Sequence, residues 1–345
     1  MGMGLDYSLL KKLSEAPGIP GWEDRVRDLV KAELKGLADE VRTDALGNVI
    51  AHKRGSGKRV MIAAHMDEIG FYVKHIDDNG FLRVQQAGGF DTRNLFARKV
   101  IVHGAKGDLS GLLNPGGKPI HISTPEERKK VPEVREFFVD VGLPAKEVNR
   151  RVRVGDPVTL VQEAGEIGDL FTGKAMDDRA QVFVLLESLR QLKGKKTNYD
   201  IFAVFTVQEE VGLRGAITSA YGVEPEIGVA LDVTLAVDIP DVKLYDSVTQ
   251  LGKGVGIKVM DSSAISDRGL VRQLVELAEK KKIPYQMEVL PLGGTDAGGI
   301  QRSRAGVPSV TLSVPTRYIH TVTEAVHKKD LEATVALLVA YLSGK

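Results

Sequence analysis

Four uninterrupted apolar runs in the outer parts of the chain predict strands that are buried on both faces. They are Val60 to Ala64, Ile201 to Val207, Ile227 to Leu231 and Ser309 to Val314. A strand with one solvated face alternates apolar and polar residues, whereas strands of a parallel sheet covered by helices are almost continuously apolar. Apolar residues at helical spacing occur between and after these runs, at residues 182–189, 271–278 and 331–338. We therefore expect an α/β fold with a helix-covered, mostly parallel sheet.

The pattern changes between about residues 70 and 162, where short strand candidates alternate with turn sequences. The turns are marked by Asp78-Asn79-Gly80, Gly88-Gly89, Ala105-Lys106-Gly107 and Pro115-Gly116-Gly117. This texture is typical of a small β-rich domain. We expect residues 1–69 and 163–345 to form the α/β domain, and residues 70–162 to form a β-rich domain inserted into it.

Composition narrows the possible partners and the possible metal ligands. Lys and Arg number 47 and Asp and Glu 46, so the formal charge of +1 implies no nucleic-acid partner. The chain has no cysteine, which excludes disulfides, thiolate ligands and a cysteine nucleophile. We expect a cytoplasmic protein with no membrane association, because the first residues do not resemble a signal peptide and no stretch approaches the ~20 apolar residues that span a bilayer.

Acidic residues and histidines follow the ends of the predicted strands. The residues with this placement are His65, Asp67, Glu209, Glu210, Asp232 and His320. Ligands of an open α/β sheet bind outside the carboxyl ends of its strands, so these segments would bring their side chains to one crevice. Asp177 and Asp178 add a further pair, directly before the helical pattern that begins near Arg179.

Two interpretations of these residues compete. Taken singly, an aspartate after a strand is more often a turn or a cap than a functional group. The adjacent acids Glu209 and Glu210 favour a function, because carboxylates crowded beside a buried strand are costly unless a cation or a shared proton compensates them. Metal binding is the preferred interpretation, and without cysteine the ligands must be His, Asp and Glu.

Other candidates receive less support from the sequence. No Gly-x-Ser-x-Gly nucleophile elbow occurs, and no serine stands out beside a candidate histidine and aspartate, which argues against a serine hydrolase. The remaining histidines lack the strand-end position and are expected to be exposed or structural: His52, His75, His103, His121 and His327.

At these residues the sequence resembles the M42 family of metallo-aminopeptidases, whose archaeal members include the tetrahedral, dodecameric TET peptidases. The resemblance runs nearly end to end, and its motifs are specific only in combination. They are Ala64-His65-Met66-Asp67-Glu68-Ile69-Gly70, Ala175-Met176-Asp177-Asp178-Arg179-Ala180, Gln208-Glu209-Glu210-Val211-Gly212, Ala230-Leu231-Asp232, Gly294-Thr295-Asp296-Ala297 and Pro315-Thr316-Arg317-Tyr318-Ile319-His320.

The resemblance implies a zinc-peptidase type of fold and a role for each matching residue. His65 and Asp232 would bind one metal ion, Glu210 and His320 the other, and Asp177 would bridge the two. Glu209 would be the general base, and Asp67 would orient the first histidine. The Asp177–Asp178 peptide bond is expected to be cis.

The resemblance also implies an activity and an assembly. Two divalent ions, zinc with cobalt also competent, would polarise a peptide carbonyl and hold the attacking water. The substrates would be short peptides with a free amino terminus. The inserted domain, residues 70–162, would mediate dimerisation, and the dimers would build a homo-oligomer of twelve subunits whose active sites face an interior chamber.

Three alternatives remain open at this point. A related two-metal amidohydrolase, such as a deblocking or deacylating enzyme, could use the same ligands on another amide. Glycan hydrolysis would need two carboxylates flanking a glycosidic bond and no metal. A non-catalytic, metal-stabilised oligomeric shell would need the ligands but not the additional acid Glu209.

Overall fold

The four predicted apolar runs form the parallel centre of a large sheet in the computed structural model, which describes residues 4–343. The strands are β3 (Arg59–His65), β12 (Asp200–Thr206), β13 (Ile227–Leu235) and β16 (Ser309–Arg317). They lie in the order β12-β3-β13-β16, and each neighbouring pair is parallel. Their carboxyl ends therefore meet at one edge of the sheet.

Shorter strands extend this centre on both sides, so that eleven strands between residues 4 and 343 belong to the sheet. One side adds β2 (Val49–Lys53) and β1 (Glu40–Thr43), both antiparallel to their neighbours. The other side adds β17 (Glu324–His327), β11 (Leu170–Gly173) and β10 (Gly165–Ile167). A branch also starts at β16, where β14 (Val255–Met260) pairs with β16 and β15 (Tyr285–Val289) pairs with β14. The predicted fold class is confirmed, with antiparallel strands at the edges.

Helices cover both faces of the sheet, which explains why its central strands are apolar throughout. In β3, Val60, Ile62 and Ala64 belong to one core, whereas Met61 and Ala63 belong to a second core. The first core is covered by α1 (Tyr7–Glu15), α2 (Asp24–Glu33), α5 (Met176–Gln191), α7 (Arg268–Lys281) and α9 (Lys328–Ser343). The second core is covered by α6 (Arg214–Val223) and α8 (Asp296–Gln301).

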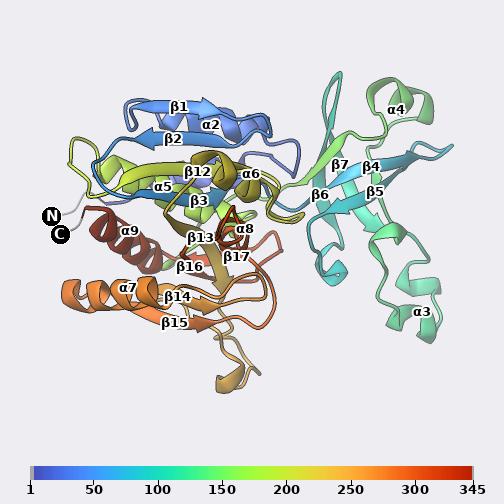
Figure 1. Ribbon diagram of the computed structural model, residues 1–345. Helices are drawn as coiled ribbons and strands as arrows, with labels where there is room; N and C mark the ends of the chain where they lie inside the picture. The colour runs from blue at the N-terminus through green and yellow to red at the C-terminus, as the bar shows by residue number, and fades with distance from the viewer. Residues whose placement is uncertain (1–3, 344–345) are drawn as a thin grey trace.

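The β-rich part forms a closed antiparallel barrel that stands beside the α/β part, away from the chain termini (Figure 1). Its core is separate from those of the sheet and includes Phe71, Phe137 and Val139. Its strands are β4 (Gly70–Ile76), β5 (Leu82–Ala87), β6 (Arg98–Gly104), β7 (Gly107–Pro115), β8 (Phe137–Asp140) and β9 (Pro157–Leu160). The inserted part also contains two short helices, α3 (Pro125–Lys129) and α4 (Ala145–Arg151). It has 3-10 turns at Thr92–Asn94, Ile120–Ile122 and Val134–Glu136. A further 3-10 turn, Leu244–Asp246, belongs to the α/β part.

Several boundaries differ from the sequence-based prediction, and two of the differences concern aspartates of the candidate site. The strand predicted to end at Leu231 continues to Leu235, so Asp232 lies within β13 and not after it. Helix α5 is assigned from Met176, but Asp177 and Asp178 have non-helical backbone angles, and the peptide bond between them is cis, as the family resemblance implied. Within the described residues, no helix is both long and apolar enough to cross a lipid bilayer.

One buried arginine ties the loop after β3 to the amino-terminal segment. Arg179 on α5 has no exposed surface. Its guanidinium donates hydrogen bonds of 2.6, 2.8, 3.4 and 2.6 Å to the main-chain carbonyl oxygens of Leu13, Ala16, Gly18 and Met66. Gly18 O also accepts the main-chain N–H of Glu68, so Arg179 chiefly satisfies the carbonyl oxygens of Leu13, Ala16 and Met66, which would otherwise be buried without this donor.

Replacement of Arg179 by methionine should lower the free energy of unfolding by about 3–5 kcal/mol, because several buried carbonyl oxygens lose their donor at once. Urea unfolding monitored by circular dichroism measures the change. Arg190 lies on the same helix and is paired near the surface with Glu33. Arg190→Met is the matched control and should cost less than about 1 kcal/mol. Equal losses in both variants would contradict the anchoring role of Arg179.

Candidate metal centre

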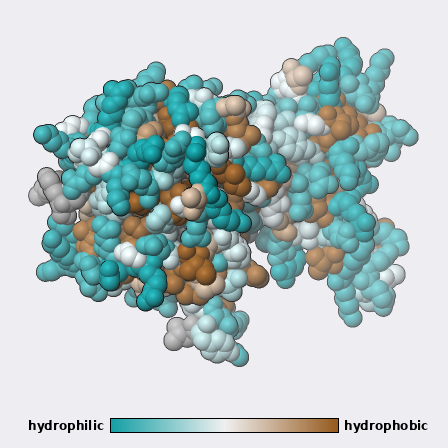
Figure 2. Space-filling view, viewed as in Figure 1, coloured by the Kyte–Doolittle hydropathy of each residue, from teal (hydrophilic) through white to brown (hydrophobic). Residues whose placement is uncertain are grey.

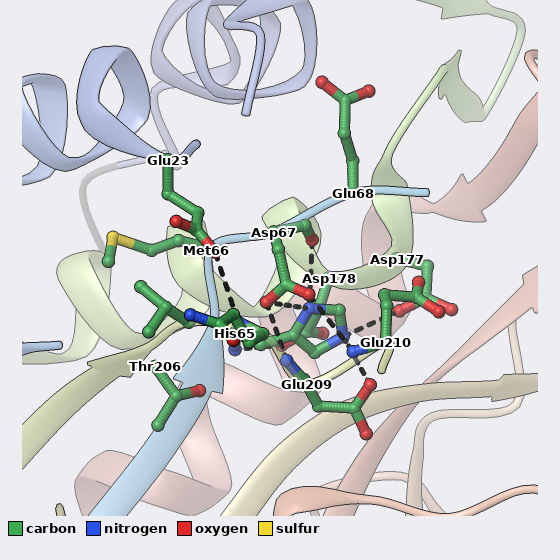
Figure 3. Close-up of polar contacts among 12 residues, drawn as sticks. Glu23, His65, Met66, Asp67, Glu68, Asp177, Asp178, Thr206, Glu209 and Glu210 are labelled. Atoms are coloured by element: carbon green, nitrogen blue, oxygen red, sulfur yellow. Dashed lines mark hydrogen bonds and ion pairs between the residues drawn. The ribbon is translucent and has the colours of Figure 1, made fainter. Parts of the chain in front are cut away.

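The predicted site residues come together at the carboxyl edge of the parallel strands. His65 is the last residue of β3, Glu209 and Glu210 follow β12, and Asp232 lies near the carboxyl end of β13. Figure 3 shows His65, Glu209 and Glu210 gathered beside Asp177 and Asp178. A cleft of about 610 Å³ opens over them, and its lining includes Asp177, Glu209, Glu210, Asp232 and His320.

A first group of possible metal ligands consists of His65, Asp177, Asp178 and Asp232. Each offers one ligand atom, and these atoms lie within 4.8 Å of one another. His65 Nε2 is 3.0 Å from Asp177 Oδ1. Asp178, which was not among the predicted ligands, accepts the main-chain N–H of His65 at 3.0 Å through Oδ2, while its buried Oδ1 has no hydrogen-bond partner.

A second group consists of Asp177, Glu210 and His320. His320 Nε2 lies 3.4 Å from Asp177 Oδ2 and 3.4 Å from Glu210 Oε1. The same Glu210 oxygen is buried and accepts no hydrogen bond. Because Asp177 directs one carboxylate oxygen toward each histidine, it belongs to both groups.

The donor set of these two groups fits divalent cations. All donors are imidazole nitrogens and carboxylate oxygens, which suit zinc and similar first-row ions. Buried polar atoms normally have partners, so the unpartnered oxygens of Asp178 and Glu210 indicate that the site is incomplete without a further positive group. A cation between the histidines and the carboxylates would supply it.

Asp67 is fully buried and binds the main chain of the loop after β12. Its Oδ1 accepts the N–H of Glu209 at 3.0 Å, and its Oδ2 accepts the N–H of Glu210 at 3.1 Å. His65 Nδ1 is 3.0 Å from the main-chain carbonyl oxygen of Asp67 and 3.6 Å from its carboxylate. The shorter imidazole contact is therefore to the carbonyl, and the carboxylate orients the two glutamates.

Glu209 lies beside both ligand groups and belongs to neither. Its Oε2 is 3.9 Å from His65 Nε2. Burial raises the pKa of Glu209 well above its ordinary value, and Asp232 and Glu210 raise it further against the opposing effect of His65. The side chain thus combines a buried position with high proton affinity.

Crowding of acids also governs the histidines. Burial alone would lower the pKa of His320, but Glu210 and Asp177 outweigh it and raise the pKa to about 12. Burial likewise acts to lower the pKa of His65, yet Glu209, Asp177 and Asp67 raise it well above the ordinary value. The same crowding of acids around the two imidazoles would favour a cation bound among them.

The barrel contributes one wall of the cleft, which the sequence did not indicate. Gly89, Phe90 and Asp91 follow β5 and line the cleft, and a Cβ atom on Gly89 would lie 3.4 Å from Nδ1 of His320. A Cβ atom on Gly88 would lie 2.5 Å from Ile69 Cγ2, so only glycine allows the loop to approach this closely. The remaining lining is mostly apolar and includes Leu213, Leu235, Leu290, Leu292 and the glycine-rich loop at Gly293 and Gly294.

Two further buried acids escaped the sequence analysis. Glu23 Oε1 accepts the N–H of Gln208 at 3.2 Å, and burial together with Asp67 raises the pKa of Glu23 to about 7. Glu324 lies beside Asp177 and His320. Neither acid follows a predicted strand end, and both act on main-chain groups that only folding brings near. Among the histidines expected to be structural, His103 is buried between Asp108 and Thr159 in the barrel.

Comparisons with known proteins agree with this fold and identify the chain as a peptide hydrolase. The profile of the family described as M42 glutamyl aminopeptidase matches residues 47–337. The lysyl aminopeptidase of Pyrococcus furiosus is 38% identical over 345 residues, covering 98% of this chain and 97% of the relative. An aminopeptidase from the archaeon Desulfurococcus kamchatkensis has a TM-score of 0.93 at 41% identity, covering 98% of this chain and 94% of that one.

The TET1 peptidase of Pyrococcus horikoshii, which can assemble into a tetrahedron or a large octahedral shell, has a TM-score of 0.87 at 34% identity. The match covers 97% of this chain and 98% of that one. The chain belongs to the M42 family of aminopeptidases, and the resemblance indicated by its sequence motifs is confirmed.

Zn²⁺ or Co²⁺ should stabilise the folded chain, because the cation relieves repulsion among carboxylates that are close together only in the native state. At a free metal concentration one hundred times the Kd, the gain is about 2.7 kcal/mol for each site. Denaturant unfolding of metal-loaded and chelated protein measures it. Asp177→Asn should abolish most of the gain, whereas the control Asp28→Asn, at an exposed position on α2, should retain it. Equal gains in both variants would contradict the assignment.

Proposed function

We propose that this protein is a dinuclear-metal aminopeptidase that removes amino-terminal residues from short peptides. The observation that carries the proposal is the pair of ligand groups that share Asp177, with Glu209 beside both and part of neither. A scaffold needs the ligands alone. An additional buried acid that lines the same cleft is the arrangement that hydrolysis requires.

In this proposal His65 and Asp232 would hold one ion, Glu210 and His320 would hold the other, and Asp177 would be a ligand of both. Asp178 supports the first position through its contact with the main chain of His65. Zinc is the proposed native ion, with cobalt also competent in such N/O sites. When bound, the two ions would polarise the peptide carbonyl and lower the pKa of water to near neutrality.

Glu209 acts as the general base and then as the general acid. Its raised pKa suits both steps, because a carboxylate that holds a proton strongly can take it from water and return it to the leaving amine. Asp67 fixes the positions of Glu209 and Glu210 by accepting hydrogen bonds from their main-chain N–H groups. The base and a metal ligand are thus positioned by a single buried carboxylate.

The cleft supports an exopeptidase acting on a free amino terminus. Its acidic floor, which includes Asp177, Glu209 and Asp232, attracts the α-ammonium group of a peptide. Its walls, formed by Leu213, Leu290 and other apolar residues, accommodate the first side chain. The name of the Pyrococcus furiosus relative, a lysyl aminopeptidase, supports the same reaction class.

We further propose that residues 1–69 and 163–345 form the catalytic domain and that residues 70–162 form a dimerisation domain. The separate core of the barrel supports this division. Large apolar side chains that are more than half exposed on the inserted part support an interface: Leu112, Ile120, Ile122, Val131 and Val154. The face in Figure 2 is mostly hydrophilic, with small hydrophobic patches on both parts. By analogy with the TET1 relative, dimers would build a homo-oligomer, which we propose to be a dodecamer.

Glu209→Gln should lower kcat by roughly 10²–10⁴-fold, because the amide cannot transfer the proton. Metal content measured by atomic emission should equal that of the wild type, since Glu209 is not a ligand. The control Glu332→Gln, at an exposed position on α9, should leave kcat unchanged. Full activity in the Glu209 variant would remove Glu209 from the mechanism.

A panel of short peptides with free and blocked amino termini separates the proposal from its alternatives. Metal-loaded enzyme should release residues only from the unblocked peptides, chelation should abolish release, and Zn²⁺ or Co²⁺ should restore it. Release is measured by chromatography of the products. Cleavage of blocked peptides would identify a deblocking or deacylating enzyme, and no cleavage of either kind would favour the metal-stabilised shell.

A further inference from the structure

We propose that Glu324 is a positioning residue that fixes Asp177 and His320 relative to one another, and thereby sets the affinity of the second ligand group for its metal ion. The inference rests on the proposed dinuclear centre and concerns a residue that is not itself a ligand. It predicts that loss of Glu324 weakens metal binding only at the second ligand group, Asp177, Glu210 and His320.

The geometry of Glu324 is that of a clamp. Its Oε2 accepts the main-chain N–H of Asp177 at 3.0 Å, and its Oε1 accepts the main-chain N–H of His320 at 2.7 Å. Glu324 is only 2% exposed, so water does not replace these bonds. One carboxylate therefore holds the main chain of two metal-ligating residues.

Strand pairing places this clamp between the segments that carry the two ligands. Glu324 begins β17, which pairs with β11 on one side and β16 on the other. The chain runs from β11 into the Asp177 segment and from β16 into the His320 segment. The first residue of the intervening strand can thus reach both.

Both N–H groups belong to main chain that has left regular structure. His320 has a φ of 61°, in the left-handed region, and Asp177 has a ψ of 101° within the stretch assigned to α5. Buried N–H groups in such positions need an acceptor outside the helix or strand ladder. Glu324 supplies it to both and so keeps Asp177 Oδ2 and His320 Nε2 3.4 Å apart.

Loss of this clamp should weaken the second ion specifically. Residues that orient metal ligands typically contribute 10–100-fold to metal affinity. Asp177 retains His65 Nε2 at 3.0 Å, and Asp232 does not contact Glu324, so the first group keeps its own contacts. A purely structural defect would lower stability without separating the two ions.

A matched control exists in the same part of the chain. Asp330 on α9 is also fully buried, and its two oxygens accept the main-chain N–H groups of Gly252 and Gly254, both at 2.7 Å. Gly252 and Gly254 belong to neither ligand group. Asp330→Asn therefore disturbs an equivalent buried clamp that lies outside the metal centre.

The experiment compares wild type, Glu324→Gln and Asp330→Asn in the full-length protein. Isothermal titration calorimetry with Co²⁺ and the visible spectrum of bound Co²⁺ resolve the two binding events, and peptide hydrolysis is measured against Co²⁺ concentration. Glu324→Gln should weaken Co²⁺ binding to the second ligand group by 10–100-fold and leave binding to the first ligand group within about threefold. Activity should recover at high Co²⁺ with unchanged KM. Asp330→Asn should bind both ions as the wild type does.

Wild-type affinity for both ions in Glu324→Gln, or equal weakening in Asp330→Asn, would overturn the proposal. If Glu324→Gln does not fold, Glu324→Asp replaces it. Its shorter side chain should weaken Co²⁺ binding to the second ligand group alone. Failure of the proposed function is seen separately in the wild type, as binding of fewer than two ions or absence of peptide release.

Discussion

The carboxylate of Asp177 lies between two imidazoles, with one oxygen 3.0 Å from His65 and the other 3.4 Å from His320. This interaction requires three segments far apart in the sequence to meet at one edge of the sheet, and it concentrates buried acids there. The parallel centre of the sheet meets the requirement, because β3, β12, β13 and β16 all end at the same edge. Much of the surrounding structure holds these charged side chains together where they are largely shielded from water.

A second set of carboxylates holds the main chain around the centre. Asp67 binds the N–H groups of Glu209 and Glu210, Asp178 binds that of His65, and Glu324 binds those of Asp177 and His320. Each acceptor satisfies N–H groups of residues at strand ends or in irregular segments, where the ladder stops. These hydrogen bonds restrict the main chain of the ligand-bearing segments, which favours tight binding of a cation because less ordering remains to be done.

The barrel has two connections to the reaction. Its loop after β5 brings Gly89, Phe90 and Asp91 to the cleft, where they face the ligand groups. Its outer surface exposes apolar residues such as Leu112 and Val131. A contact between subunits through these apolar residues would lie on the same separately packed barrel that forms one wall of the cleft.

The sequence by itself determined the fold class, the strands that carry the site and the residues that converge there, because apolar runs and adjacent acids such as Glu209 and Glu210 are local patterns. Family motifs added the proposed roles of His65 and Asp232 as metal ligands. Only the tertiary structure decided that Asp67 binds main-chain N–H groups, that Asp178 lies within the first ligand group, and that the barrel forms one wall of the cleft. These features depend on contacts between residues distant in the chain, which no local periodicity encodes.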